Sequence, residues 1–265
     1  MKKALAVLIA LFSMLLATPA GAQDDATIML AHGIPDTDVD VVVDGDVVIP
    51  NYSFGSMEDL SAFAGQTLPN LTVNLAGTDT VALDLGDFAV PATGNFTVVA
   101  HLDADGNPTA SVFENDTSTI AAGEGRLVVR HTAAAPEVDI LANGAAAFTS
   151  VPNGAEGQVD LAAGTISAEV VPAGATEPVV IGPADLPITE GSSLIVYAVG
   201  SLDAGNLTVL TQSISGLGAT PNAVNTGNSP VSGDTNNGVA LVVAAGIALL
   251  GFGVVSARRG ALVRG

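Results

Sequence analysis

Two stretches of the sequence decide the fold: AHGIPDTDVDVVVDG at residues 31–45 and RHTAAAPEVDILANG at residues 130–144. Each has a histidine seven residues before a Val-Asp-Val or Val-Asp-Ile segment, and each ends in Asp-Gly or Asn-Gly, a strong signal for a tight hairpin turn. The matching positions are displaced by 99 residues. A displacement kept over so many positions predicts an internal duplication.

The duplication extends beyond these two stretches. Gly55 and Gly154 keep the displacement of 99, and Leu102-Asp103-Ala104 recurs as Leu202-Asp203-Ala204 at a displacement of 100. We therefore expect two homologous units of roughly 100 residues, a size that can bury its own hydrophobic core.

Short segments rich in Val, Ile, Leu and Thr fill both units and are bounded by Gly, Pro, Asn or Asp, whereas no window shows a helical period. The expected strands are residues 27–31, 39–43, 71–75, 96–101, 126–131, 138–141, 194–199 and 207–212. Many short strands at this spacing predict an all-β fold, either sandwiches or barrels.

The motif at residues 130–144 resembles the opening of bacterial and archaeal cell-surface domains grouped as domain of unknown function 4397. In that family a histidine, small residues and Ala-Pro precede Val-Asp-Val and Asn/Asp-Gly. The first unit is less similar, since Ala31 stands where the second has Arg130. The resemblance implies two tandem immunoglobulin-like β-sandwich domains. It implies no activity, because the family has no established one.

Both ends of the chain carry targeting signals. Two lysines precede an N-terminal apolar run, and Ala20-Gly21-Ala22 supplies the small residues that signal peptidase requires, so we expect cleavage after Ala22. Residues 238–257 are uncharged and apolar, and as a helix of about 30 Å they match a bilayer core. The alternatives are an uncleaved N-terminal anchor and a buried core helix.

The charges after the apolar span predict its orientation. Arg258, Arg259 and Arg264 follow it, and basic residues stay on the cytoplasmic side of a membrane. We therefore expect a single-pass cell-membrane protein with an extracellular body. Residues 223–227 followed by the span and the basic tail resemble a sortase substrate without the usual Leu-Pro, so attachment to the cell wall is an alternative.

The predicted organisation has six parts. They are a signal peptide (1–22), a first β-sandwich (23–121), a second β-sandwich (122–215), a flexible stalk rich in Gly, Asn, Thr and Ser (216–237), a transmembrane helix (238–257) and a basic cytoplasmic tail (258–265).

The charge balance limits the function. The chain has 27 Asp and Glu against 7 Lys and Arg, and only Arg126 and Arg130 lie between the two ends. A body this acidic does not bind nucleic acid, which requires a basic surface. With no Cys, the chain has no disulfide, thiolate metal site or cysteine nucleophile.

Two acidic segments are candidate Ca²⁺ sites, because this ion takes hard oxygen ligands. Asp103, Asp105, Asn107 and Glu114 match positions one, three, five and twelve of an EF-hand loop, but Pro108 stands where that loop needs glycine. A hairpin turn at Asp105-Gly106 is the simpler interpretation.

The second acidic segment contains Asp36, Asp38 and Asp40, which alternate with Thr and Val. This alternation is also typical of a strand with one solvent-exposed face. We therefore expect neither acidic segment to provide a confident metal site.

His32 and His131 occupy equivalent places and could act as ligands or pH switches, although duplication and a structural role at a strand end explain them more simply.

The body offers no convergent set of nucleophile and base, so we expect no enzyme and no cofactor. The sequence favours a non-enzymatic surface protein with a structural, adhesive or ligand-display role. The alternatives are a ligand- or calcium-binding module of the cell envelope and a hydrolase with an acid pair.

Overall fold

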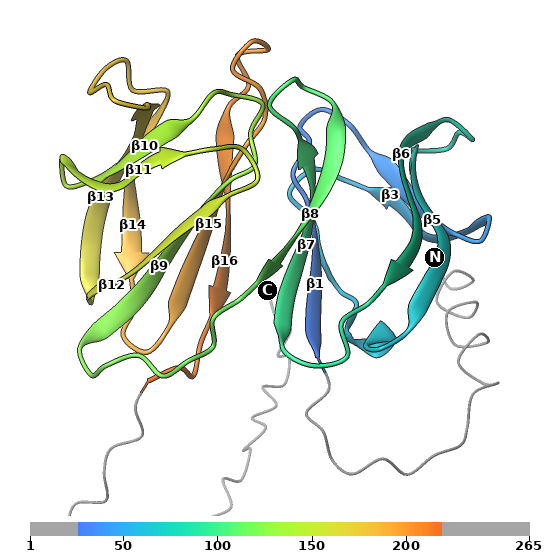
Figure 1. Ribbon diagram of the computed structural model, residues 1–265, viewed down its shortest axis with the longest axis horizontal. Coiled ribbons are helices and arrows are strands. Elements are labelled where there is room, and N and C mark those ends of the chain that lie inside the picture. Colours follow the sequence, from blue (N-terminus) through green and yellow to red (C-terminus); the bar gives the residue numbers. More distant parts are fainter. Residues whose placement is uncertain (1–25, 219–265) are drawn as a thin grey trace, which may run out of the picture. The chain divides into compact units, whose positions relative to one another are not determined.

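The computed structural model describes residues 26–218, and its regular structure is β except for a single 3-10 turn at Ser61–Phe63 (Figure 1). Within this part of the chain, no helix is long and apolar enough to cross a membrane. The predicted signal peptide with Ala22, most of the stalk, the transmembrane helix and the tail with Arg258, Arg259 and Arg264 lie outside the described residues.

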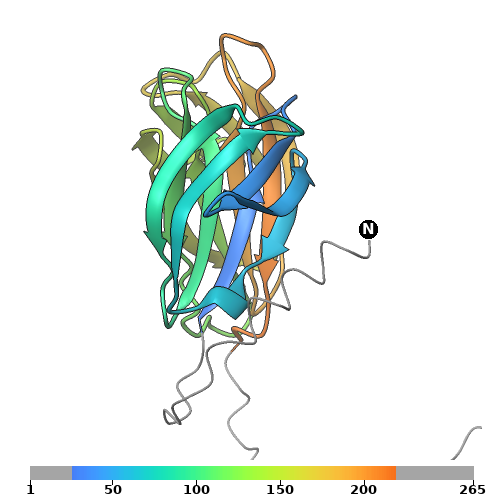
Figure 2. The same cartoon turned by 90° about the vertical axis from the view of Figure 1, so that its right-hand side faces the viewer.

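The first half contains eight strands in two four-stranded sheets, β4-β1-β7-β8 and β3-β2-β5-β6. Strands β1 and β7 pair in parallel, and the other neighbours are antiparallel. Figure 2 looks onto the β3-β2-β5-β6 sheet. The bounds are β1 (Thr27–His32), β2 (Val39–Val43), β3 (Asp46–Tyr52), β4 (Met57–Asp59), β5 (Thr67–Leu75), β6 (Val81–Ala89), β7 (Asn95–Leu102) and β8 (Pro108–Glu114).

The second half repeats this topology with every strand number raised by eight, giving the sheets β12-β9-β15-β16 and β11-β10-β13-β14. Its one parallel pair, β9 with β15, corresponds to β1 with β7. The bounds are β9 (Glu124–His131), β10 (Val138–Ala142), β11 (Ala145–Val151), β12 (Glu156–Ala162), β13 (Gly164–Pro172), β14 (Ile181–Ile188), β15 (Ser193–Val199) and β16 (Thr208–Ile214). The predicted all-β, sandwich-like fold is confirmed.

Strand register refines the internal alignment. Phe96 of β7 pairs with Ile28 of β1, and Leu194 of β15 pairs with Leu127 of β9, so β7 and β15 are displaced by 98 residues. The Leu-Asp-Ala repeat at a displacement of 100 is therefore not equivalent in register, since Leu102 ends β7 whereas Leu202 lies beyond β15.

Each half has a core between its own two sheets, and a further core joins the halves. This joining core lies between β4-β1-β7-β8 and β12-β9-β15-β16, which we call the inner sheets. Its buried members are Ala31, Val99, Phe113, Val128, Ile195, Tyr197 and Val199. As a result β9 is buried on both faces, with seven of its eight residues buried. The described residues of both halves belong to one compact unit.

The contacts between the inner sheets are reciprocal. A Cβ added to Gly55 would lie 3.5 Å from Leu210, and one added to Gly154 would lie 4.0 Å from Ser111. By register Ser111 is the counterpart of Leu210, just as Gly55 is the counterpart of Gly154. Exchange of the partners' roles is the mark of a two-fold interface, so the halves pack in the manner of a symmetric dimer.

The two ends of the sandwiches differ in what they carry. At one end, which we call the tip, β1, β7, β9 and β15 finish, and the Asn153 side chain donates to the Leu102 carbonyl across the halves. At the opposite end, the base, Leu217 accepts from the Ile120 N–H and donates to Gly191. The described chain therefore ends at the base, and the tip is formed by loops.

The shared core predicts that the two halves unfold together. Separating the inner sheets would expose Phe113, Tyr197 and the other members of the joining core to water, at about 25 cal/mol for each Å² of apolar surface. Thermal unfolding followed by circular dichroism and calorimetry is expected to give one transition, with equal calorimetric and van't Hoff enthalpies. Two separate transitions would contradict a shared core.

Candidate functional site

The acidic residue of each Val-Asp strand has a structural role. Asp40 is buried, and its two carboxylate oxygens accept the N–H groups of Asn51, at 2.7 Å, and Gly77, at 2.8 Å. Both donors have left-handed backbones, with φ of 50° and 70°, and the carboxylate holds these irregular turns. The same arrangement in the second half is made by Asp139, Ser150 and Gly174.

This arrangement corrects one expectation about the segment containing Asp36, Asp38 and Asp40. Asp36 and Asp38 are exposed in the loop before β2, while Asp40 points into the protein and has both oxygens occupied. The interpretation of a strand with one exposed face is therefore wrong, because β2 is buried on both faces. The three carboxylates do not converge on one point.

The second calcium candidate is a hairpin loop. One oxygen of Asp103 accepts the N–H groups of Asp105, at 2.9 Å, and Asn107, at 2.8 Å, and hydrogen bonds from Asn107 lower the pKa of Asp103. Gly106 adopts the left-handed conformation that the turn requires, with φ of 87°. Glu114 pairs with Phe96 at the far end of β8, about 20 Å along the strand from the turn.

The four candidate ligands Asp103, Asp105, Asn107 and Glu114 are thus not brought together. Among residues 26–218, no group of three or more His, Asp or Glu side chains has the geometry to hold a metal ion.

The histidines of the two motifs are buried and tie down the loops that follow β1 and β9. The Nε2 of His32 lies 2.7 Å from the Thr37 carbonyl, and that of His131 lies 3.0 Å from the Pro136 carbonyl. Because a carbonyl only accepts, Nε2 carries the proton in both rings. The Nδ1 atoms of both histidines lack a hydrogen-bond partner. Because both halves share this feature, it does not mark a functional site in either of them.

A third buried histidine lies at the tip, where the halves meet. The Nδ1 of His101 donates to the Leu102 carbonyl at 2.8 Å, and its Nε2 accepts from the Ser111 hydroxyl at 2.8 Å. Burial lowers the pKa of His32, His101 and His131, because the charged imidazolium loses its hydration.

The strongest polar arrangement centres on Arg130, for which the sequence analysis predicted no structural role. Its side chain is only 1 % exposed. Nε donates to Glu156 at 2.7 Å, Nη1 to the Tyr197 hydroxyl at 2.8 Å and Nη2 to the Asn115 side chain at 2.8 Å. The guanidinium carbon lies 4.4 Å from the ring centroid of Phe113 and 5.3 Å from that of Tyr197, so the cation is held between an aromatic ring of each half.

A hydrogen-bonded network spreads from this arginine across the inner sheets. Tyr197 donates to the Gln212 side-chain oxygen at 2.6 Å, and Thr97 of the first half donates to the same atom at 3.0 Å. Asn115 in turn donates to Thr97 at 3.1 Å and to Asn95 at 2.7 Å. Both halves therefore contribute to a single buried network.

Arg126 repeats this clamp four residues earlier on the same face of β9. It forms a bidentate pair with Asp160, at 2.8 and 3.1 Å. Nη1 also donates to the Asp116 carbonyl at 3.0 Å and to the Ser118 carbonyl at 3.4 Å, in the segment that joins β8 to β9. The only two cationic residues of the described chain are thus both buried, and both hold the connection between the halves.

A polar groove of about 510 Å³ lies beside this connection. Its acidic lining includes Glu114, Asp116 and Glu156, of which Asp116 and Glu156 are paired with the arginines. The groove is therefore the outer edge of the arginine clamp.

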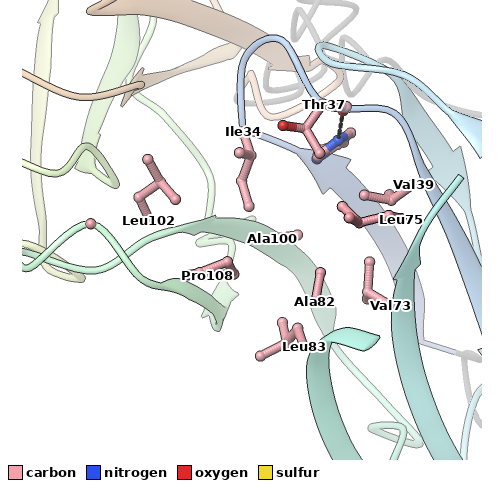
Figure 3. A pocket seen from close by; sticks show the side chains of 12 residues that line it. Ile34, Thr37, Val39, Val73, Leu75, Ala82, Leu83, Ala100, Leu102 and Pro108 are labelled. Carbon is pink, nitrogen blue, oxygen red and sulfur yellow. Dashed lines mark hydrogen bonds between the residues drawn. The ribbon is translucent and has the colours of Figure 1, made fainter. Parts of the chain in front are cut away.

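A second cavity, of about 240 Å³, opens at the tip of the first half (Figure 3). It lies between the two sheets of that half, with side chains of β2 and β5 on one side and of β7 and β8 on the other. Apolar residues form most of its lining, which consists of His32, Ile34, Thr37, Val39, Val73, Leu75, Ala82, Leu83, Ala100, Leu102, Gly106 and Pro108.

One family match covers the opening motif of the first half, its hairpin loop and the start of the second half. Residues 26–141 match the family described as Domain of unknown function (DUF4397). The DUF4397 match covers β1 to β8 and continues through β9 into β10, so it includes the first opening motif, most of the second and both clamp arginines. No curated protein matches the chain.

Replacing the buried arginine is expected to destabilise the protein strongly. Arg130→Met keeps the apolar stem but removes the hydrogen bonds that the buried Asn115 oxygen and Tyr197 hydroxyl accept from a charged donor, which costs about 1–3 kcal/mol of unfolding free energy for each. Urea denaturation measures this loss. Val112→Met, at an exposed position on β8, is the control and is expected to change stability by less than about 0.5 kcal/mol. An Arg130→Met protein as stable as wild type would contradict the clamp.

Stability is expected to fall as pH drops below about 6.5, the ordinary pKa of histidine. Because the folded pKa values of His32, His101 and His131 are lowered, the unfolded chain takes up protons there that the folded chain does not. Each histidine contributes a slope of up to about 1.4 kcal/mol per pH unit. Denaturation between pH 7.5 and 5 measures this slope, and His101→Gln should reduce it. A constant unfolding free energy over this range would contradict the expectation.

Proposed function

We propose that this chain is a non-enzymatic, membrane-anchored surface protein that displays two tandem immunoglobulin-like DUF4397 domains outside the cell. Its role is to display the two domains as one rigid, acidic unit. Ligands or partner proteins bind at the tip of this unit. The sequence features that support this are the N-terminal signal, the low-complexity segment and the basic-flanked apolar span.

One observation carries the proposal: Arg126 and Arg130 are both buried in the connection between the halves. They fasten the halves to each other. Because the three histidines are buried as well, carboxylates are the only charged side chains on the surface of residues 26–218. A surface of one sign keeps neighbouring copies apart and repels polyanions, which suits a protein displayed at high density.

The positions of the chain ends support the direction of display. The described chain leaves the double sandwich at the base, next to Gly191 and Ile120. An anchor that follows residue 218 would therefore attach the double sandwich through its base, and the tip loops would lie at the end farther from the attachment point. Loops at the free end of a rigid scaffold are the usual places for recognition.

Cell fractionation tests this function. The full chain carrying an epitope tag after Gln23 is expected to remain with the membranes after an alkaline wash, to be stained by antibody on intact cells, and to appear in the medium when residues 238–265 are deleted.

Three outcomes would contradict the proposal. They are a tag that antibody reaches only in lysed cells, release of the full chain by a cell-wall hydrolase instead of by detergent, and turnover of glycoside, ester or peptide substrates by the purified protein.

A further inference from the structure

We propose that the tip cavity of the first half binds a small organic cation, a primary ammonium group on a compact branched alkyl body. This inference concerns the ligand class, and it holds whether or not the chain is anchored in a membrane. Two independent features carry it, the apolar shape of the cavity and the charge of its mouth.

The cavity is a preformed apolar space open to solvent. In Figure 3 the side chains of Val39, Val73 and Leu75 face those of Leu102 and Pro108. Its volume, about 240 Å³, is below the range of sites for drug-sized ligands and suits a short branched alkyl group. Leu75 is 39 % exposed, so an apolar ligand entering the cavity would also cover a large apolar side chain that water now reaches.

The cavity exists because one position on β6 is small. By strand register Ala82 is the counterpart of Val180, which packs against the core of the second half. Alanine at this position leaves unfilled space between the sheets of the first half. The second half therefore shows which side chain fits the same place in this fold, and it provides a mild substitution for filling the cavity.

The mouth of the cavity carries only negative charge. Thr37 and Gly106 line it, and their chain neighbours are the exposed acids Asp36, Asp38 and Asp105. These carboxylates lie well within a Debye length of the entrance at physiological salt. Both arginines of the described chain are buried in β9 and paired with Asp160 and Glu156, so they do not neutralise the mouth. A cation is attracted here, and an anion of the same shape is repelled.

Three probes with the same alkyl group and different charge test this directly: 3-methylbutylammonium, 3-methylbutan-1-ol and 3-methylbutanoate. Each is titrated into the purified full chain, with methyl NMR of Ala82, Leu83 and Leu102 as the readout. The ammonium is expected to bind about threefold to tenfold more tightly than the alcohol, and the carboxylate more weakly still. The preference should shrink in 1 M salt.

Matched variants separate the two features. Ala82→Val should weaken all three probes, whereas Ala89→Val, the same change at an exposed position of β6, should leave binding unchanged. Asp38→Asn and Asp105→Asn should reduce the preference for the ammonium without changing alcohol binding, whereas Asp46→Asn, at the start of β3 away from the tip, should have no effect.

Several results would overturn the proposal. They are equal affinity for the ammonium and the alcohol, shifts spread over exposed methyls away from the cavity, or unchanged binding in Ala82→Val. A peptide such as Lys-Leu-Lys amide is the last comparison. If it saturates the cavity at concentrations too low for the ammonium to bind, the proposal is overturned in favour of a peptide site. None of these results depends on where the chain is located in the cell.

Discussion

The buried guanidinium of Arg130 is the constraint on which the arrangement of the two halves depends. A charge with 1 % exposure is tolerated only if its donors are satisfied and its charge is paired. Here those conditions require Glu156 and Tyr197 from the second half and Asn115 from the connection, with the Phe113 ring of the first half above the cation. Moving the halves apart would take Asn115 and the Phe113 ring away from the guanidinium and leave its Nη2 without a partner, so these two contacts specify one relative position.

The network occupies a scaffold that is otherwise symmetric. Where the second half has Arg130 and Tyr197, the first half has Ala31 and Val99 in the same register, and the large polar side chains on one side of the interface face small apolar ones on the other. The duplicated surface therefore has a shared apolar core with a polar clamp to one side. This divergence explains how an interface with reciprocal contacts can still have a single, asymmetric buried cation.

The sequence predicted the inner strands better than the edge strands, for a physical reason. All eight expected strands are present, and seven of them are central strands, among which β2, β9 and β15 have apolar runs that are buried on both faces. Edge strands such as β6 and β14 contain Gly or Pro and exposed residues, which weaken the pattern.

The structural role of Asp40 and the position of Glu114 could not be predicted from the sequence, because they depend on long-range contacts. Burial of Arg126 and Arg130 had one sequence signal, two cations four residues apart on the same face of a predicted strand.

Hydrogen exchange tests the clamp most directly, because it reports the stability of each half separately. In the wild-type protein the slowest amides of β1 and β7 and those of β9 and β15 are expected to share one free energy of opening. Arg130→Met should lower protection in both halves by the same amount, since they open together. Loss of protection in the second half alone, with β1 and β7 unchanged, would contradict the account.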